Sequence, residues 1–226
     1  MAILLPMVRY RLHLTTTPPP LPPHPQPQAS QSSRWKIPLI ILASIVGLVL
    51  LIIGIGVLFV LTARDFTPTE DQKDAVVTVD YVAEWFDIEP EERGETWECK
   101  RYLDGSKEIF YLYYHEYITL DCTLTIERKR SDTLTSYTME WQALKLGNRL
   151  GDSSINLEED DTVFQWGDAS KFAYQSSDGE RNGFAFITRK DNKIFFFDAW
   201  GLTFDDPSDV AKFLTPKLEH YEKTAF

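Results

Sequence analysis

One uncharged segment constrains this chain more than any other feature. Residues 37–63 form a run of 27 residues without Asp, Glu, Lys or Arg. As a helix, residues 37–62 would rise about 39 Å at ~1.5 Å each, which exceeds a ~30 Å hydrocarbon core. The run therefore predicts a single N-terminal transmembrane helix over residues 37–62. The residues expected to anchor it in the membrane are Trp35, Lys36, Ile37 and Thr62.

A buried soluble helix and a cleaved signal peptide both fit this segment less well. A helix buried in a soluble domain normally keeps a polar face over such a length. A cleaved signal peptide has an apolar stretch of only ~7–15 residues, and a cleavage site ending at Ala63 would put the large Leu61 where a small residue is preferred. We therefore expect an uncleaved anchor.

The flanking charges predict the orientation of this helix. Arg34 and Lys36 precede it, whereas Arg64 is the only base close behind it, so the N-terminus should be cytoplasmic. The C-terminal domain would then lie outside the cytoplasm, in the periplasm or the extracellular space, with the lipid bilayer as a partner. Ala43 and Gly47 have a small-xxx-small spacing that allows a weak homodimer, although the same residues are equally compatible with a lipid-exposed face.

Residues 1–36 form a proline-rich tail. Nine of the 13 prolines lie within residues 1–38, and Met7 offers a second translation start besides Met1. Such a composition forms neither helix nor sheet, and it predicts a disordered cytoplasmic segment biased to polyproline II. Leu21 among the prolines could dock into an aromatic-lined groove, with a passive spacer as the alternative.

The charge is concentrated in the remainder of the chain. Residues 1–62 hold four basic residues and no acid, so residues 63–226 hold 19 basic and 34 acidic residues, a net charge of −15. This charge disfavours binding to nucleic acid and to anionic lipid head groups. The length suits one domain, and we expect a tether over residues 63–74 followed by an acidic domain over residues 75–226.

Hydrophobic periodicity predicts three helices in the acidic domain. Thr69 and Gln72 have the spacing of a capping box before the first helix, although residues 76–79 are also β-prone. The second helix should begin at Ser131 or Asp132 and stop at Gly147, and the third should begin at Pro207. The apolar residues at helical spacing are Val76, Val79, Val82, Ala83 and Phe86, then Leu134, Tyr137, Trp141 and Leu144, then Val210, Phe213, Leu214 and Leu218.

Seven strands are predicted, and the first three show alternating apolar and polar residues. The first three form a meander with a two-residue hairpin turn at Asp104-Gly105. Their expected core-facing residues are Trp97, Cys99, Leu103, Phe110, Leu112, Tyr114, Ile118, Leu120, Cys122, Leu124 and Ile126. Four further strands are expected at residues 163–166, 171–175, 183–190 and 193–200. The resulting order of helix, three strands, helix, four strands and helix predicts an α+β fold, an α/β/α sandwich on a mainly antiparallel sheet.

The same pattern resembles the PsbP-like family, whose best-known members are extrinsic proteins of photosystem II. The similarity lies in Trp97 opening the first strand, the hairpin at 104–106, the helix capped by Ser131 and the strand 193–197 before the last helix. It covers about residues 95–226. The resemblance implies a small α/β/α binding or scaffolding domain without chemistry of its own. The chain departs from the family in its uncleaved anchor and proline-rich tail.

No motif predicts a catalytic residue, a cofactor or a metal site. His115 and His220 lack the spacing of metal ligands, and the acidic runs 158–161 and 205–206 lack the Asp-x-Asp-x-Asp-Gly loop of a calcium site. A solvated charge run accounts for those acids, although two acids that catalyse hydrolysis need not be close in sequence. The tentative binding surface is Tyr111, Tyr113, Tyr114 and Tyr117. Core packing accounts for Tyr111 and Tyr113 equally well.

These features predict a single-pass membrane protein that displays an acidic extracytoplasmic binding or scaffold domain. Its ligand would be a protein or a small molecule of unknown identity. The alternative is a membrane-anchored, carboxylate-dependent hydrolase. Two buried carboxyl groups with raised pKa values in one cleft would favour the hydrolase, and a flat aromatic patch would favour binding.

The two cysteines test the predicted meander. An even number of cysteines outside the cytoplasm normally suggests a disulfide. With a two-residue turn after Leu103 and a three-residue turn at 115–117, however, Cys99, Phe110 and Cys122 form one row across three strands. The outer two would then lie about 9.6 Å apart, beyond the ~7 Å limit for a bridge. We therefore predict two buried free thiols.

Overall fold

Eight strands form one antiparallel sheet in the order β1-β2-β3-β4-β8-β7-β6-β5. The structure, a computed structural model, describes residues 41–42, 45–51, 54, 62–89, 94–151 and 155–225. The strands are β1 (Arg64–Asp65), β2 (Glu95–Arg101), β3 (Lys107–His115), β4 (Ile118–Ile126), β5 (Ile155–Glu159), β6 (Ala169–Ser177), β7 (Glu180–Lys190) and β8 (Lys193–Trp200). The helices of this domain are α2 (Glu70–Asp74), α3 (Val79–Ala83), α4 (Arg130–Gly151) and α5 (Pro207–Lys223).

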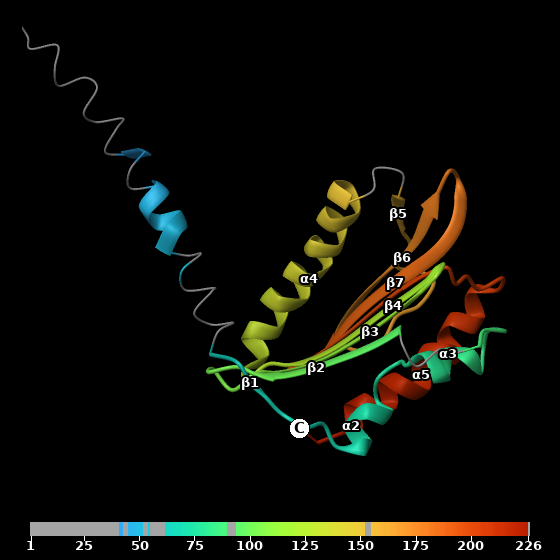
Figure 1. Ribbon diagram of the computed structural model, residues 1–226, viewed down its shortest axis with the longest axis horizontal. Coiled ribbons are helices and arrows are strands. Elements are labelled where there is room, and N and C mark those ends of the chain that lie inside the picture. Colours follow the sequence, from blue (N-terminus) through green and yellow to red (C-terminus); the bar gives the residue numbers. More distant parts are fainter. Residues whose placement is uncertain are drawn as a thin grey trace, which may run out of the picture. The chain divides into compact units, whose positions relative to one another are not determined.

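Helices cover both faces of the sheet, as the predicted sandwich requires. Figure 1 shows α4 on one face, and α2, α3 and α5 on the other. The larger apolar cluster lies under α2, α3 and α5, whereas a smaller one containing Tyr137, Trp141 and Phe196 lies under α4. Helix α4 packs mainly on β5, β7 and β8, and on β3 the α4-side residues Phe110, Leu112 and Tyr114 are less buried than Ile109, Tyr111 and Tyr113. This less buried part of the sheet borders the candidate site described below.

The closing helix forms as predicted. Asp206 caps its N-terminus by accepting a hydrogen bond from the Ser208 N–H at 2.8 Å, and Pro207 occupies the first turn. Near the other end, the Tyr221 hydroxyl donates to the backbone carbonyls of Thr125 and Ile194 at 2.7 and 3.0 Å. These bonds join α5 to β4 and β8. The predicted core residues Val210, Phe213, Leu214 and Leu218 are all buried.

The prediction of one first helix is wrong, because the structure has two short helices in its place. Thr69 and Gln72 form the predicted capping box, but α2 ends at Asp74. Thr78 then caps α3 by accepting from the Tyr81 N–H. The β-prone residues 76–78 between the two helices interrupt the helical conformation.

The first hairpin is longer by one residue than predicted. The Tyr102 N–H donates to the Ser106 carbonyl at 2.9 Å, so three residues form the turn, with Gly105 at a φ of +92°. Cys99 therefore pairs with Ile109 instead of Phe110. A shift of one residue moves every side chain of a strand to the other face. Phe110, Leu112 and Tyr114 accordingly face the α4 side, and the core positions of β3 are Ile109, Tyr111 and Tyr113.

Three further predictions differ from the structure in the second half of the domain. Residues 163–166 form no strand, and the edge strand β5 lies instead at Ile155–Glu159. Helix α4 continues beyond Gly147, since a glycine inside a helix costs only ~1 kcal/mol and need not end it. Leu134 is exposed near the start of α4, while Tyr137 and Trp141 are buried as predicted. Asp178, Gly179 and Asp191 adopt positive φ values in the turns that separate β6, β7 and β8.

The prediction of two buried free thiols is confirmed, although for a different register. Cys99 and Cys122 are both free and buried. Cys99 aligns through Ile109 with Leu124, so the two cysteines are two strands apart and offset by two residues. That separation is about 9.6 Å across the sheet and ~6.8 Å along it, too far for a disulfide.

The predicted transmembrane helix is contradicted. Among the residues that the structure describes, no helix has both the length and the apolar character needed to cross a membrane. The anchor residues Trp35, Lys36 and Ile37, and the dimer position Ala43, lie outside the described residues. The predicted tail, tether, orientation and location outside the cytoplasm stay predictions.

Candidate functional site

A carboxylate-lined groove lies between α4 and the sheet. It consists of two adjoining cavities of about 570 and 240 Å³, and Glu140 of α4 lines both. We call this site the α4 groove. The larger cavity is lined by Tyr102, Asp104, Ser106, Glu108, Thr125, Glu127, Asp132, Thr135, Ser136, Met139 and Glu140. The smaller one is lined by Asp121, Thr123, Glu140, Ala143, Leu144, Phe196 and Asp198.

Seven acidic residues from several parts of the fold line the α4 groove. They are Asp104 in the first hairpin turn, Glu108 of β3, Asp121 of β4, Glu127 just after β4, Asp132 and Glu140 of α4, and Asp198 of β8. No Lys, Arg or His side chain is among the described residues that line it. The groove therefore concentrates negative charge without an opposite charge of its own.

One carboxyl pair of the groove is set by the sheet register. Asp121 and Asp198 are direct partners across the antiparallel pair of β4 and β8. Side chains at such positions have Cβ atoms about 4.5–5.5 Å apart and point to the same face. The two carboxyl groups are thus neighbours because of the backbone, whatever their rotamers.

Neutral donors hold most of these carboxyl groups in place. The Gln175 side-chain N–H donates to Asp198 Oδ1 at 2.5 Å, and the Thr123 hydroxyl donates to Asp121 Oδ1 at 3.1 Å. The Ser136 hydroxyl donates to Glu127. The Tyr102 hydroxyl donates to Glu108 at 3.3 Å. A hydroxyl or an amide positions a carboxylate without neutralising it, so the mutual repulsion remains.

The electrostatics of the groove favour protonation. Burial raises the pKa of Glu140 to about 8, and repulsion from Glu108, Asp121 and Glu127 adds to the rise. Burial and the charge of Asp121 raise the pKa of Asp198 to about 7. Burial raises the pKa of Asp121 to about 6 against the opposing hydrogen bond from Thr123. At neutral pH the α4 groove therefore retains protons that exposed carboxyl groups would have lost.

The four tyrosines of the predicted binding surface are divided between the core and the exterior. Tyr111 and Tyr113 are buried under the N-terminal helices, where the Tyr111 hydroxyl accepts a hydrogen bond from the Val79 N–H at 2.9 Å. Tyr114 and Tyr117 are 64% and 82% exposed at the hairpin between β3 and β4. These four residues do not form one flat aromatic patch. A binding role for the exposed pair stays a prediction.

The acidic runs in the sequence have ordinary structural roles. Glu158 pairs with Arg181 at 3.4 Å, and Glu159 pairs with Lys145 at 2.5 Å. Asp206 caps α5. In the part of the chain that the structure describes, no cluster of His, Cys, Asp and Glu side chains is arranged to hold a metal ion.

Sequence patterns do not single out the residues of the α4 groove. The one signal is Asp198, which is the only charged residue between Ile194 and Trp200 in a strand that is otherwise apolar on both faces. Asp121 is one of the polar positions that alternate with the core residues of its strand, and such positions normally face water. Comparison with known proteins adds nothing to these observations, because no family model, curated protein or solved structure matches the chain.

Proposed function

We propose that the folded domain is a binding module whose α4 groove accepts a cationic organic group, an ammonium or a guanidinium. The observation that carries this proposal is the set of seven acidic residues with no cationic side chain among the described residues lining the same groove. Like charges held together in a partly buried site destabilise the folded state. A bound cation would remove that repulsion, which makes the groove a receptor for positive charge.

The walls of the groove indicate which other chemical groups a cationic ligand should carry. The larger cavity, at about 570 Å³, is within the ~300–1,000 Å³ range of small-molecule sites. Met139, Leu144 and Phe196 supply apolar surface beside the carboxyl groups. An amine with an aliphatic stem, such as a polyamine or a lysine side chain, matches both kinds of surface.

Calorimetry with spermidine as the probe tests this proposal. Because the pKa of Glu140 is raised to about 8, it is largely protonated at pH 7.0, and a bound cation should displace its proton. Titrations in two buffers of different ionisation enthalpy should therefore reveal proton release. Glu140→Gln should weaken binding by about tenfold, which corresponds to the loss of one charge-assisted contact of ~1.4 kcal/mol.

The matched control is Glu180→Gln, since Glu180 is an exposed acid at the start of β7 and does not line the α4 groove. This variant should bind spermidine as the unchanged chain does. Equal weakening in both variants would show only general attraction to an acidic protein. Absence of binding at low ionic strength would contradict the proposal.

A carboxylate-dependent hydrolase is the second candidate function, and the pair of Asp121 and Asp198 supports it. Two carboxyl groups with pKa values of about 6 and 7 can divide the roles of general acid and general base near neutral pH. The cavity beside them is only about 240 Å³, so a substrate would extend into the larger cavity.

Asp198→Asn and Asp121→Asn distinguish the two candidate functions. For a hydrolase, either substitution should abolish turnover of a chromogenic glycoside, and the unchanged chain should show a bell-shaped pH profile. For a binding module, no glycoside or ester is turned over, while spermidine still binds. Turnover that survives both substitutions would remove the pair from any mechanism.

A further inference from the structure

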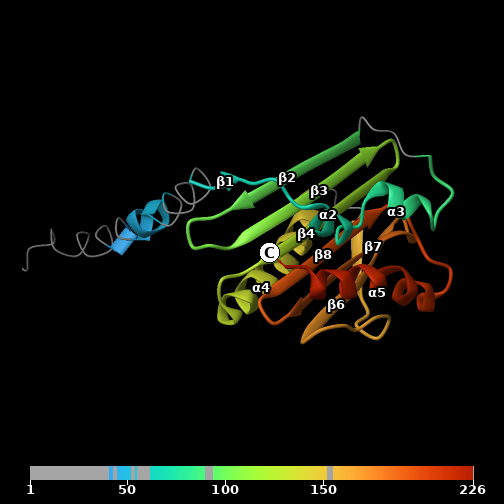
Figure 2. The same cartoon turned by 90° about the horizontal axis from the view of Figure 1, so that it is seen from below.

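The outer edge of β2 lacks a partner strand over most of its length. Strand β1 pairs with β2 only at Arg64↔Arg101 and Asp65↔Lys100, followed by a hydrogen bond from the Phe66 N–H to the Cys99 carbonyl at 3.1 Å. Figure 2 shows β1 beside one end of β2. Among the described residues, no strand pairs with the outer edge of residues 95–98.

The free edge presents hydrogen-bonding groups to the exterior. In an antiparallel ladder, alternate residues direct both their N–H and their C=O to the same neighbour. Because the Cys99 carbonyl bonds to the β1 side, Trp97 and Glu95 direct their backbone groups to the same side. An edge of this kind is a template for an added strand.

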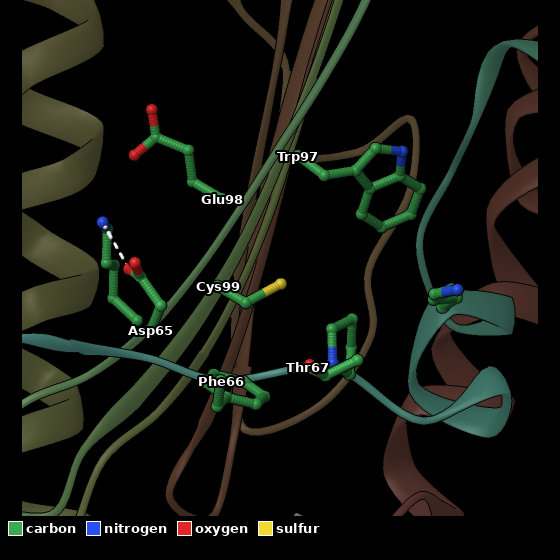
Figure 3. A pocket seen from close by; sticks show the side chains of 9 residues that line it. Asp65, Phe66, Thr67, Trp97, Glu98 and Cys99 are labelled. Carbon is green, nitrogen blue, oxygen red and sulfur yellow. Dashed lines mark hydrogen bonds and ion pairs between the residues drawn. The ribbon is translucent and has the colours of Figure 1, made fainter.

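A cavity of about 750 Å³ adjoins this free edge, and we call it the edge pocket. Figure 3 shows the Trp97 and Cys99 side chains on one side of β2, toward α2, with Glu98 on the other side. The edge pocket is lined by Asp65, Phe66, Thr67, Pro68, Lys73, Trp97, Glu98, Cys99 and Lys100. Its apolar wall is formed by Phe66, Pro68 and Trp97, which suits a large apolar side chain.

From the open edge and the adjoining pocket together, we infer that β2 binds an extended peptide of another protein, one that alternates basic and apolar residues. The peptide residue opposite Trp97 points toward the edge pocket, so it should be apolar. Its neighbours point to the opposite face, beside Glu98, so they should be basic. This surface is separate from the α4 groove, and the inference goes beyond the proposed function.

Charge selects this partner over a second copy of the chain. The free segment of β2 carries Glu95 and Glu98 and no base. Pairing two copies there would bring four carboxylates together, and like charges across a strand pair are destabilising. The other edge strand, β5, also carries acids at Glu158 and Glu159. The acidic edge of β2 therefore attracts a basic peptide and repels another copy of the chain.

The probe is a fluorescein-labelled Lys-Val-Lys-Phe-Lys-Val-Lys peptide titrated with the full-length chain. Residues opposite Trp97 direct their N–H toward β2, so N-methylation of Val and Phe should abolish binding. N-methylation of the backbone nitrogens of the Lys residues modifies the other edge of the peptide and should change the affinity less than about threefold. In the protein, Glu98→Lys should weaken binding of the unmodified peptide by about tenfold. Glu180→Lys is the matched control and should bind normally.

Four results would overturn the inference. Equal binding of an analogue peptide with Glu in place of every Lys would remove the charge argument. Equal loss of binding from both methylation patterns would exclude an added strand. Weakening by Glu140→Gln with no effect of Glu98→Lys would place the peptide in the α4 groove instead. Dimerisation of the free chain that is abolished by Glu98→Lys would assign the edge to a second copy. Loss of peptide binding with intact spermidine binding, by contrast, would leave the proposed function untouched.

Discussion

Asp121 and Asp198 lie directly opposite each other on β4 and β8, and the charge of one raises the pKa of the other. Opposed acids at the centre of a sheet are unfavourable for folding unless they are protonated or neutralised. The Gln175 and Thr123 hydrogen bonds position these carboxyl groups but carry no charge. We therefore relate this pair of acids to the binding of a cation in the α4 groove.

Removing one of these opposed charges should stabilise the domain. Asp198→Asn keeps the acceptor oxygen for Gln175 and abolishes the repulsion, so we expect the free energy of unfolding to rise by roughly 1–2 kcal/mol at pH 8. Urea denaturation at pH 8 measures this change. Asp178→Asn is the control, because Asp178 lies in an exposed turn at a φ of +55° that Asn tolerates. Destabilisation by Asp198→Asn would mean that another group in the folded domain compensates the negative charge of Asp198.

Stability should fall as the pH rises. Between its unfolded and its folded pKa, a carboxyl group with a raised pKa binds more protons in the folded chain than in the unfolded one, so the free energy of unfolding decreases with pH. For Asp121, Asp198 and Glu140 this window runs from about 4 to about 8. We expect a loss of roughly 1–3 kcal/mol across it in urea titrations.

Glu140→Gln should flatten this pH dependence above pH 6, because Glu140 has a higher pKa than Asp121 and Asp198. The same variant should be more stable than the unchanged chain at pH 8 and similar to it at pH 4. A slope unchanged by Glu140→Gln would show that other groups titrate in this window.

Tyr111→Phe should destabilise the domain. The Tyr111 hydroxyl accepts the hydrogen bond of the Val79 N–H at the start of α3, and both residues are buried. Removing this acceptor leaves a buried N–H unpaired, at a cost of ~1–3 kcal/mol. Tyr114→Phe modifies an exposed ring of the same strand and should change stability by less than about 0.5 kcal/mol. Equal effects in thermal unfolding would contradict the observed register of β3.

The two thiols should differ in reactivity. Cys99 lines the edge pocket, whereas Cys122 is fully buried and its Sγ lies 3.4 Å from the Val77 N–H. Burial raises the pKa of both thiols, to about 12 for Cys122, so alkylation of the folded chain should be slow. We expect Cys99 to react first and Cys122 only on unfolding, as followed by peptide mass mapping. A disulfide detected without reductant would contradict the strand order.

The sequence predicted the elements of this fold better than the relations between them. Alternation located β4, a continuous apolar run located β8, and Pro207 located the start of α5, because these signals depend on local burial and on local backbone geometry. The register of β3 depended on one extra residue in the turn at 103–105 and on one residue fewer in the turn after His115, where the predicted three-residue turn is a two-residue turn. Composition reveals neither difference. Together they exchanged Tyr111 with Phe110 between the two faces.

The α4 groove was harder to predict for a similar reason. Asp121 and Asp198 are 77 residues apart in the chain, and only the pairing of β4 with β8 brings them together. Glu140 joins them because α4 crosses this half of the sheet. With 34 acids in the chain, no spacing rule distinguishes these three from those that face solvent.

The pKa of the Glu140 side chain, measured by NMR titration of its carboxyl carbon with and without spermidine, tests the central claim most directly. Glu140 should titrate near 8 in the free chain, and its pKa should fall when spermidine occupies the α4 groove. The assignment is checked with Glu140→Gln. A pKa in the ordinary range of glutamate in the free chain, or a raised pKa that spermidine leaves unchanged, would contradict the account of this groove as a receptor for positive charge.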